Sequence, residues 1–221
     1  MFNNKVVLVT GGTGSFGKKF VKKLLDDFNC KKIVIFSRDE LKQFELRGAL
    51  SKHKRARSLR FFLGDIRDKS RLLTALNNVD YVIHCAALKQ IEAAEYNSQE
   101  CVKTNIIGTQ NVIEGCIDKN VKKVISLSTD KAVDPINLYG ATKLAADKLT
   151  ISSNLISVHK DTIFSVVRYG NVINSRGSVI PFFKSLLKEK SKFIPLTHSD
   201  MTRFFISLED SVEFVIKSFY R

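Results

Sequence analysis

Short apolar runs alternate with amphipathic stretches along the chain. Val6–Thr10 is an uninterrupted apolar run, which is typical of a strand buried on both faces. Phe16, Phe20 and Leu24 follow it at helical spacing. The alternation then continues, with strand-like runs at 32–36, 59–63, 81–85, 124–127 and 164–167, and helical patterns at 41–50, 69–76, 98–120 and 137–153. This order predicts an α/β fold with a doubly wound parallel sheet and helices on both faces.

The first strand leads into a glycine-rich turn that opens the first helix. Gly11 permits the tight turn, Gly14 lets the backbone approach a pyrophosphate, and Gly17 allows close packing of helix on strand. An anion then lies on the N–H groups at the helix start. Strand, glycine turn and helix in this order favour a dinucleotide site over a merely structural turn. The predicted phosphate-binding residues are Gly11, Thr13, Gly14, Ser15, Phe16 and Gly17.

The end of the second strand bears on which dinucleotide is bound. NAD sites usually place an acidic side chain here to accept the ribose hydroxyls, whereas a guanidinium and a hydroxyl suit a 2′-phosphate. Ser37 and Arg38 therefore predict NADP, although Asp39 could still bind the ribose of NAD, and Arg38 could be an ordinary surface charge. The residues assigned to this end of the cofactor are Ser37, Arg38, Asp39, Glu40, Leu41 and Lys42.

Two polar clusters near the middle of the chain carry the candidate chemistry. Asp130 and Lys131 follow the fifth strand-like run, and Tyr139 and Lys143 stand four residues apart in the next helical pattern. Residues at this spacing share a helix face, so the Lys143 ammonium is expected to lower the pKa of the Tyr139 phenol. An isolated pair of this kind is usually an exposed pair without a role, but the preceding dinucleotide motif favours a redox pair.

Length and composition are consistent with one domain and a small appendage. The 221 residues contain three prolines and 11 glycines, with no linker-like segment. We divide the chain into a dinucleotide-binding domain at 1–170 and a substrate region at 171–221. The first strand follows Met1–Asn4 almost directly, which leaves no room for a signal peptide, and no apolar run reaches the about 18 residues of a membrane span.

The four cysteines and four histidines show no metal-ligand spacing. We interpret Cys30, Cys85, Cys101 and Cys116 as reduced thiols of a cytoplasmic protein. The net charge of +14 raises the alternative of nucleic-acid binding. Its densest basic run, Ser51–Arg57, lies between a helix and a strand and has no interleaved aromatic residues, so a solvated loop is the favoured interpretation and no nucleic-acid partner is expected.

Several of these motifs resemble a known family. Thr10–Gly17, the pair Tyr139 and Lys143, and the strand order resemble the extended short-chain dehydrogenase/reductase superfamily. Within it, the chain is similar to the inverting UDP-N-acetylglucosamine 4,6-dehydratases, which begin pseudaminic acid biosynthesis. The segments that carry this closer likeness are 37–43, 86–89, 128–143, 168–172, 175–179 and 201–204. Members of this family continue past the helix that ends near Arg221, so we expect an incomplete C-terminal substrate region.

The resemblance implies a role for each matching residue. Tyr139 and Lys143 would serve the oxidation at carbon 4, with Thr129 bonded to that hydroxyl. Lys131 would remove the carbon-5 proton, and Asp130 would protonate the leaving hydroxyl at carbon 6. Further cofactor contacts are expected from Asp65, Ile66, Cys85, Ala86, Ala87, Thr104 and Val172. Contacts with a UDP-sugar are expected from Lys89, Thr129, Asn171, Arg176, Gly177, Ser178, Val179 and Arg203.

Lys131 is the unusual element of this set. Retaining dehydratases have a carboxylate at the matching position, and a lysine can replace it as a base only if burial and nearby cations lower its pKa. Lys131 could instead only bind phosphate. Lys89 and Arg203 could instead form surface salt bridges. Self-association is expected from the resemblance, through the helices at 98–120 and 137–153.

Three functions remain open on the sequence. The first is the inverting dehydratase, which forms a UDP-4-keto-6-deoxy-L-arabino-hexose by internal hydride transfer through bound NADP. The second is a nucleotide-sugar 4-epimerase, which shares Tyr139 and Lys143 but needs no base at position 131. The third is a truncated, catalytically impaired dinucleotide-binding protein.

Overall fold

Six parallel strands form the central sheet in the order β3-β2-β1-β4-β5-β6. The computed structural model describes residues 1–157, 161–175, 177–191, 193–196 and 198–220. The strands are β1 (Val6–Thr10), β2 (Lys32–Ser37), β3 (Leu59–Leu63), β4 (Tyr81–His84), β5 (Lys123–Thr129) and β6 (Ile163–Tyr169). The strand order reverses direction between β1 and β4, so the sheet is doubly wound as the sequence predicts, and ligands of such sheets bind at this point.

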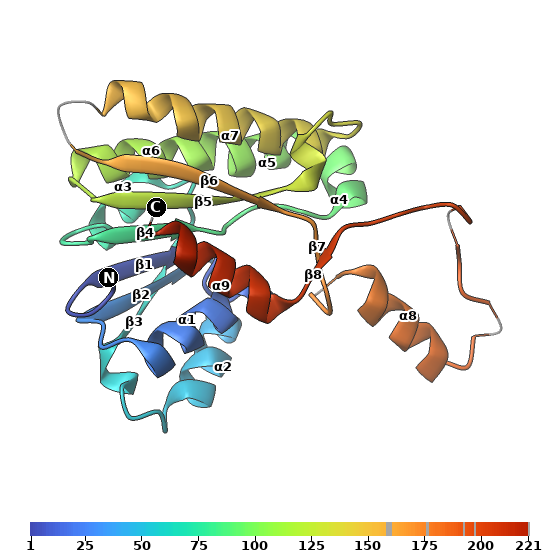
Figure 1. Ribbon diagram of the computed structural model, residues 1–221, viewed down its shortest axis with the longest axis horizontal. Coiled ribbons are helices and arrows are strands. Elements are labelled where there is room, and N and C mark those ends of the chain that lie inside the picture. Colours follow the sequence, from blue (N-terminus) through green and yellow to red (C-terminus); the bar gives the residue numbers. More distant parts are fainter. Residues whose placement is uncertain (158–160, 176, 192, 197, 221) are drawn as a thin grey trace.

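Helices cover both faces of the sheet (Figure 1). One layer holds α1 (Ser15–Asp27), α2 (Glu40–Leu50) and α9 (Leu208–Ser218), and the other holds α3 (Lys69–Ala75), α6 (Gly108–Asp118) and α7 (Leu138–Ile156). A continuous helical stretch of α5 (Ser98–Val102), a π-helical turn (Lys103–Ile107) and α6 confirms the long helical pattern at 98–120. Short elements complete this part: α4 (Ile91–Tyr96) and the 3-10 turns Ala56–Ser58 and Asp130–Ala132.

The buried core divides into two layers because each strand of the sheet presents alternate residues to opposite faces. Val7 and Val9 of β1 pack in a cluster with residues of α1 and α9, while Val6 and Leu8 pack in a second cluster with residues of α3 and α6. Each of these four valine and leucine side chains is no more than 6% exposed. This double burial explains the unbroken apolar run at the start of the sequence.

The C-terminal part leaves the sheet and returns to it. After β6, the short strands β7 (Asn171–Val172) and β8 (Phe205–Ile206) pair with one another, and α8 (Val179–Lys188) stands out to one side (Figure 1). Helix α9 then packs against α1, with Val215 and Phe219 fully buried in the same cluster as β1. The division at residue 170 stays a prediction, but the last helix lies on the sheet and not with the outlying segment.

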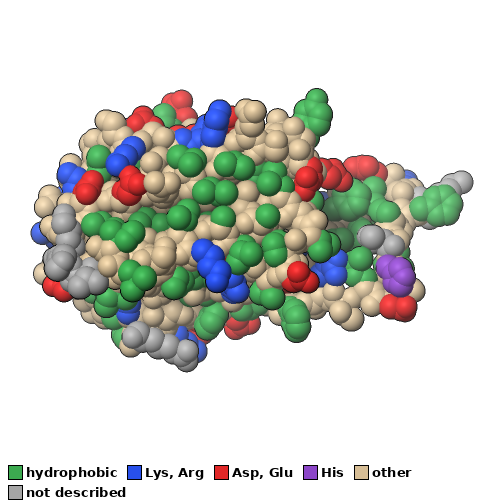
Figure 2. All heavy atoms as spheres, turned by 90° about the horizontal axis from the view of Figure 1, so that it is seen from above, with side chains coloured by type: hydrophobic (Ala, Val, Ile, Leu, Met, Phe, Trp, Pro, Cys, Tyr) green, Lys and Arg blue, Asp and Glu red, His purple; other side chains and the backbone are tan. Residues whose placement is uncertain are grey.

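The outer face of the α7 layer carries exposed hydrophobic side chains. Ile151, Leu155 and Ile156 of α7 are 50%, 80% and 72% exposed. Figure 2 looks onto this side of the molecule and shows hydrophobic side chains scattered over much of it. Among the described residues, no helix combines the length and the apolar character that crossing a bilayer requires.

Candidate active site

A cleft of about 790 Å³ lies outside the carboxyl ends of the strands. It gathers residues from the glycine turn, from α7 and from the ends of β2, β3, β4, β5 and β6, because parallel strands all end at the same edge of the sheet. Most residues assigned to the cofactor from the sequence line it: Gly11, Thr13, Gly14, Ser15, Phe16, Gly17, Ser37, Arg38, Asp39, Lys42, Asp65, Ile66, Cys85, Ala86, Ala87, Thr104, Tyr139, Lys143 and Val172. Glu40 and Leu41 do not line it, and Leu41 is 66% exposed on α2.

The glycine turn at one end of the cleft leaves no room for side chains. Gly11 has a φ of 63°, and a Cβ added there would lie 2.9 Å from the backbone nitrogen of Ala86. A Cβ at Gly17 would lie 2.6 Å from the carbonyl oxygen of Gly11. The turn therefore brings bare backbone to the cleft at the point where α1 begins, and the N–H groups of a first helical turn have no partner within the helix. A phosphate group fits this cradle.

The end of β2 presents cations to the cleft, while its carboxylate is engaged. The carboxylate of Asp39 accepts the backbone N–H of Lys42 at 2.9 Å, which caps α2, and it also pairs with the Lys42 ammonium. Arg38 is half exposed, and its guanidinium lies 3.5 Å from the carboxylate of Asp65. The hydroxyl of Ser37 accepts a hydrogen bond from Gln43 at 3.0 Å. Arg38 and Lys42 thus both line the cleft, each paired with a carboxylate.

A buried histidine, His84, holds the loop after β4 in place. The Thr109 hydroxyl donates to the carbonyl of Asn105 at 2.7 Å, so it accepts from Nε2–H of His84 at 3.0 Å. Nδ1 of His84 then accepts from the Thr10 hydroxyl at 2.8 Å, and the oxygen of Thr10 accepts the backbone N–H groups of Cys85 and Ala86. The network fixes the tautomer of His84 and the course of the loop that lines the cleft.

We expect His84 to make the fold sensitive to acid. Burial and the charge of Lys143 lower the pKa of His84 to about 3, so the native state keeps it neutral, whereas the unfolded chain binds a proton below a pH of about 6.5. The unfolded state thus binds more protons as the pH falls, and His84 costs about 1.4 kcal/mol of stability per pH unit between these two values.

Urea unfolding at several pH values tests this expectation. In His84→Gln, the slope of unfolding free energy against pH should be shallower below a pH of about 6. The exposed His198 provides the matched control His198→Gln, which should leave the slope unchanged. Equal slopes in the wild-type protein and His84→Gln would contradict the neutral buried histidine.

The segment after β5 forms a compact polar cluster. The Nζ of Lys131 donates to Oδ1 of Asp130 at 3.0 Å and to Oδ1 of Asn171 at 2.8 Å. The hydroxyl of Thr129 donates to the same oxygen of Asp130 at 2.9 Å. Burial acts to raise the pKa of Asp130, but the hydrogen bonds from Lys131 and Thr129 outweigh it and hold this pKa below its ordinary value. Thr129, Lys131 and Asn171 line the cleft, and Asp130 is not part of its lining but is hydrogen-bonded to Lys131.

The expected lowering of the Tyr139 pKa is wrong for this structure. Burial raises the pKa of Tyr139, and the charges of Asp130 and Asp147 add to the rise, while a hydrogen bond with Thr129 opposes it. Lys143 is 5% exposed, and its Nζ donates to the carbonyl of Leu127 at 2.7 Å. The two side chains do share the cleft, as their spacing predicts. The desolvation of the phenol outweighs the amine one helical turn away.

Sequence reasoning missed Asp147, the third member of this helix face. Asp147 is 3% exposed, and its Oδ2 accepts from the Ser128 hydroxyl at 2.9 Å and from Nε of Arg168 at 2.7 Å. Its position four residues after Lys143 was a readable signal. Nothing in the sequence indicated its partners Ser128 and Arg168, because only the tertiary fold brings β5 and β6 to α7.

The residues assigned to a sugar nucleotide are only partly assembled. Lys89, Asn171, Gly177, Ser178 and Val179 line the cleft, and burial lowers the pKa of the Lys89 amine. Arg203 is exposed on the segment before β8 and is not part of the lining, and Arg176 lies outside the described residues. In the described part of the chain, no group of three His, Cys, Asp or Glu residues could hold a metal ion.

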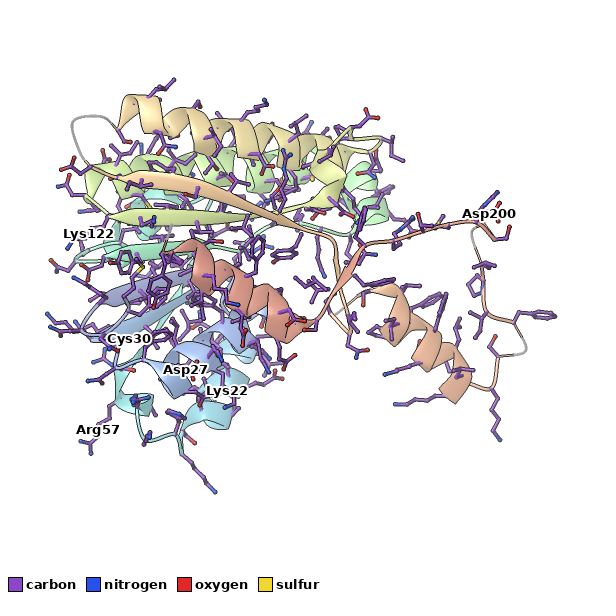
Figure 3. The ribbon with its side chains drawn as sticks, viewed as in Figure 1. Lys22, Asp27, Cys30, Arg57, Lys122 and Asp200 are labelled. Atoms are coloured by element: carbon purple, nitrogen blue, oxygen red, sulfur yellow. The ribbon has the colours of Figure 1, made fainter. Side chains whose placement is uncertain are left out.

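The basic run and the outlying segment lie away from this chemistry. Arg57 points outward at the edge where the strands begin, as does Lys122, whose amine lies 3.5 Å from Asp80 (Figure 3). Asp200 lies on the outlying segment between α8 and β8 (Figure 3). Arg57, Lys122 and Asp200 do not line the cleft.

A doubly wound sheet with a glycine cradle and a Tyr–Lys pair at its carboxyl edge defines an extended short-chain dehydrogenase/reductase. Comparison with known proteins agrees with this class. Residues 7–221 match the family described as "Polysaccharide biosynthesis protein", and the chain belongs to that family.

Two curated relatives show where the chain lies within the family. It is 57% identical over 221 residues to a "UDP-N-acetylglucosamine 4,6-dehydratase (inverting)" of Campylobacter jejuni, covering 100% of this chain and 65% of that protein. It is 45% identical over 222 residues to a "UDP-glucose 4-epimerase" of Rickettsia bellii, covering 99% of this chain and 64% of the relative. The first confirms the likeness predicted from the motifs. The chain spans just under two thirds of the length of both relatives.

Solved structures give the same fold. The chain superimposes with a TM-score of 0.95 on Pen from Bacillus thuringiensis at 41% identity, over 100% of this chain and 68% of that one. It superimposes with a TM-score of 0.82 on DesIV, a dTDP-glucose 4,6-dehydratase from Streptomyces venezuelae with NAD and TYD bound, at 23% identity, over 95% of this chain and 70% of that one. The second likeness shows the fold alone.

Proposed function

We propose that this chain carries the catalytic centre of a UDP-N-acetylglucosamine 4,6-dehydratase that inverts carbon 5. The observation that carries the proposal is the position of Lys131: its amine lies between Asp130 and Asn171, in the same cleft as Tyr139 and Lys143. An elimination needs a base, an acid and a redox pair together. Lys131, Tyr139 and Lys143 line this cleft, and Asp130, the candidate acid, is hydrogen-bonded to Lys131. The likeness to the Campylobacter dehydratase supports this assignment.

Each residue of the site has one chemical role in the proposed reaction. A bound nicotinamide dinucleotide supplies the acceptor and later the donor of a hydride. Tyr139 takes the proton of the carbon-4 hydroxyl while Thr129, which bonds the phenol, holds that oxygen. The resulting ketone acidifies the proton on carbon 5. Lys131 removes that proton, and Asp130 protonates the hydroxyl that leaves carbon 6 as water.

The contact between Lys131 and Asp130 addresses the difficulty of using a lysine as the base. The Lys131 amine donates to Oδ1 of Asp130 at 3.0 Å, and the pKa of that carboxyl is held low, whereas the reaction needs a neutral amine and a protonated carboxyl. Moving that one proton from Nζ to Oδ1 creates the neutral base and the protonated acid in a single step. Closure of the cleft around a sugar nucleotide would favour the neutral pair, because a dry site disfavours separated charges.

For the cofactor we propose NADP over NAD. Arg38 and Lys42 face the cleft, and Asp39 is held by the cap of α2 and by Lys42, so it is poorly placed to accept ribose hydroxyls. The glycine cradle would bind the pyrophosphate, with Asp65 and Ile66 at the adenine. In equilibrium titrations, NADP should bind more tightly than NAD, and Arg38→Ala should reduce the difference.

The proposal extends to the substrate and to the setting of the reaction. Lys89, Asn171 and the turn at 177–179 would contact the UDP-sugar, and Arg203 would have to join them. The contact predicted for Arg176 falls outside the described residues. The product would enter pseudaminic acid biosynthesis, as the resemblance of the sequence motifs to the inverting dehydratases implies. The four cysteines are free thiols, which supports a location in the cytoplasm. Exposed hydrophobic side chains on α7 support association of two copies through that layer.

A 4-epimerase is the second candidate, and the 45% identity to the Rickettsia proteins favours it specifically. Incubation with UDP-N-acetylglucosamine and NADP, followed by mass spectrometry, separates the two reactions. A dehydratase gives a product lighter by one water, whereas an epimerase gives an isomer of equal mass. NADP binding with no turnover and no binding of any UDP-sugar would leave only the dinucleotide-binding protein.

A further inference from the structure

The face of α7 that carries the redox pair ends in a buried acid. Tyr139, Lys143 and Asp147 follow one another at intervals of four residues, so a phenol, an amine and a carboxylate lie in a row along one side of the helix. Lys143 is 5% exposed and Asp147 is 3% exposed. Two ionisable groups buried one turn apart interact far more strongly than a surface pair, because little water screens them.

One oxygen of Asp147 is anchored and the other is not. Oδ2 accepts from Ser128 of β5 and from Arg168 of β6. Oδ1 is buried and, within the described part of the chain, has no hydrogen-bond partner. A buried carboxylate oxygen without a donor is costly unless a positive charge compensates it. The Arg168 guanidinium compensates the carboxylate at Oδ2, and the Lys143 ammonium lies one turn away on the same face of α7.

The buried amine of Lys143 in turn requires a nearby negative charge to stay protonated. Its amine donates to the carbonyl of Leu127, the neighbour of Ser128 on β5. Burial lowers the pKa of Lys143, and the charges of Asp147 and Cys85 oppose that fall. The other groups that face the amine are Tyr139 on α7 and His84 at the end of β4, and neither is charged in this structure. Cys85 is a buried thiol whose pKa is itself raised by burial, so it holds its proton near neutral pH.

We propose that Asp147 is a positioning residue that keeps the Lys143 amine protonated and directed at the Leu127 carbonyl, beside the phenol of Tyr139. Ser128 and Arg168 hold the carboxylate in place for this task. The inference rests on the proposed function for the importance of Lys143, but not for the interaction itself. The competing account is that Asp147 only ties β5 and β6 to α7 through a structural ion pair.

Titration of the lysine amine in the protein without substrate distinguishes the two accounts. In the full 221-residue chain with nitrogen-15 lysine, the Nζ signal of Lys143 is assigned as the one lost in Lys143→Arg. In Asp147→Asn, which keeps the shape and one acceptor oxygen but removes the charge, Lys143 should lose its proton at a lower pH than in the wild-type protein. An unchanged titration in the folded variant overturns the proposal.

Arg168→Gln is the second variant, and it should shift the pKa of the Lys143 amine in the direction opposite to Asp147→Asn. It removes the guanidinium from the same ion pair but leaves the carboxylate, so more of that charge is available to Lys143. The Lys143 amine should then hold its proton to a higher pH than in the wild-type protein. A purely structural role predicts similar loss of thermal stability in both variants and no opposite shifts of the amine, and this result would also overturn the proposal.

Because the titration of the Lys143 amine needs no substrate, it tests the role of Asp147 independently of the proposed function. Shifts of the Lys143 amine in opposite directions, in a protein that does not turn over any UDP-sugar, would support the role of Asp147 and reject the dehydratase. With substrate turnover present, Asp147→Asn should lower the rate of hydride transfer about tenfold near neutral pH and leave the affinity for NADP within about twofold.

Discussion

Lys131→Arg is expected to abolish elimination of water while leaving the fold and NADP binding intact. The guanidinium keeps the positive charge and can still donate to Asp130 and Asn171, but it cannot give up its proton at any accessible pH. The kcat for the dehydrated product should therefore fall by about 10²–10⁴-fold, the usual contribution of a positioned general base. The measurement is the steady-state rate of release of the 4-keto-6-deoxy product.

The variant also separates the two candidate enzymes. An epimerase needs only the redox pair, so Lys131→Arg with full conversion of a UDP-sugar to its 4-epimer would contradict the dehydratase. Lys103→Arg is the matched control, since Lys103 is exposed on the π-helical turn and pairs with Glu100. Lys103→Arg should change neither the kcat for the dehydrated product nor the free energy of unfolding. If Lys131 only bound phosphate, Lys131→Arg would retain activity, because arginine binds phosphate well.

Tyr139→Phe is expected to stop the reaction before elimination. Without the phenolic oxygen, no group in the cleft takes the proton of the carbon-4 hydroxyl, and the rate of nicotinamide reduction in a single turnover should fall by at least about 10²-fold. The cavity is nearly conserved, so binding of the sugar nucleotide should change little. Single-turnover absorbance of the reduced nicotinamide measures this step directly.

An exposed tyrosine provides the control for this second variant. Tyr96 is 92% exposed at the end of α4, and Tyr96→Phe should leave the single-turnover rate unchanged. Because burial raises the pKa of Tyr139 in this structure, the rate of hydride transfer in the wild-type protein should increase with pH as the phenol loses its proton. Equal rates for Tyr139→Phe and the wild-type protein would remove Tyr139 from the mechanism.

The sheet and its cradle were predictable because their signals are local. Val6–Thr10 is apolar throughout since it is buried on both faces, and the glycines that follow are required by backbone contacts a few ångströms long. The strand ends then had to meet at one edge, so the convergence of Lys131, Tyr139 and Asn171 followed from topology alone. These are patterns that a single sequence carries in full.

The electrostatics of the site could not be derived in the same way. Spacing places Lys143 beside Tyr139, but whether the phenol's pKa rises or falls depends on burial, which is set by elements far along the chain. The ion pair of Asp147 with Arg168 joins residues 21 positions apart in the sequence on a helix and a strand. Arg203 was assigned by likeness, and the exposed segment that holds it lies outside the lining of the cleft.

The configuration at carbon 5 tests the central claim most directly. UDP-N-acetylglucosamine is incubated with the protein and NADP in heavy water, and the product is analysed by NMR. The account predicts a 4-keto-6-deoxy sugar that carries deuterium at carbon 5 and has the inverted configuration there, because the new proton must reach carbon 5 on the face opposite to the one from which Lys131 removes it. A deuterated product that retains the gluco configuration at carbon 5 would contradict it.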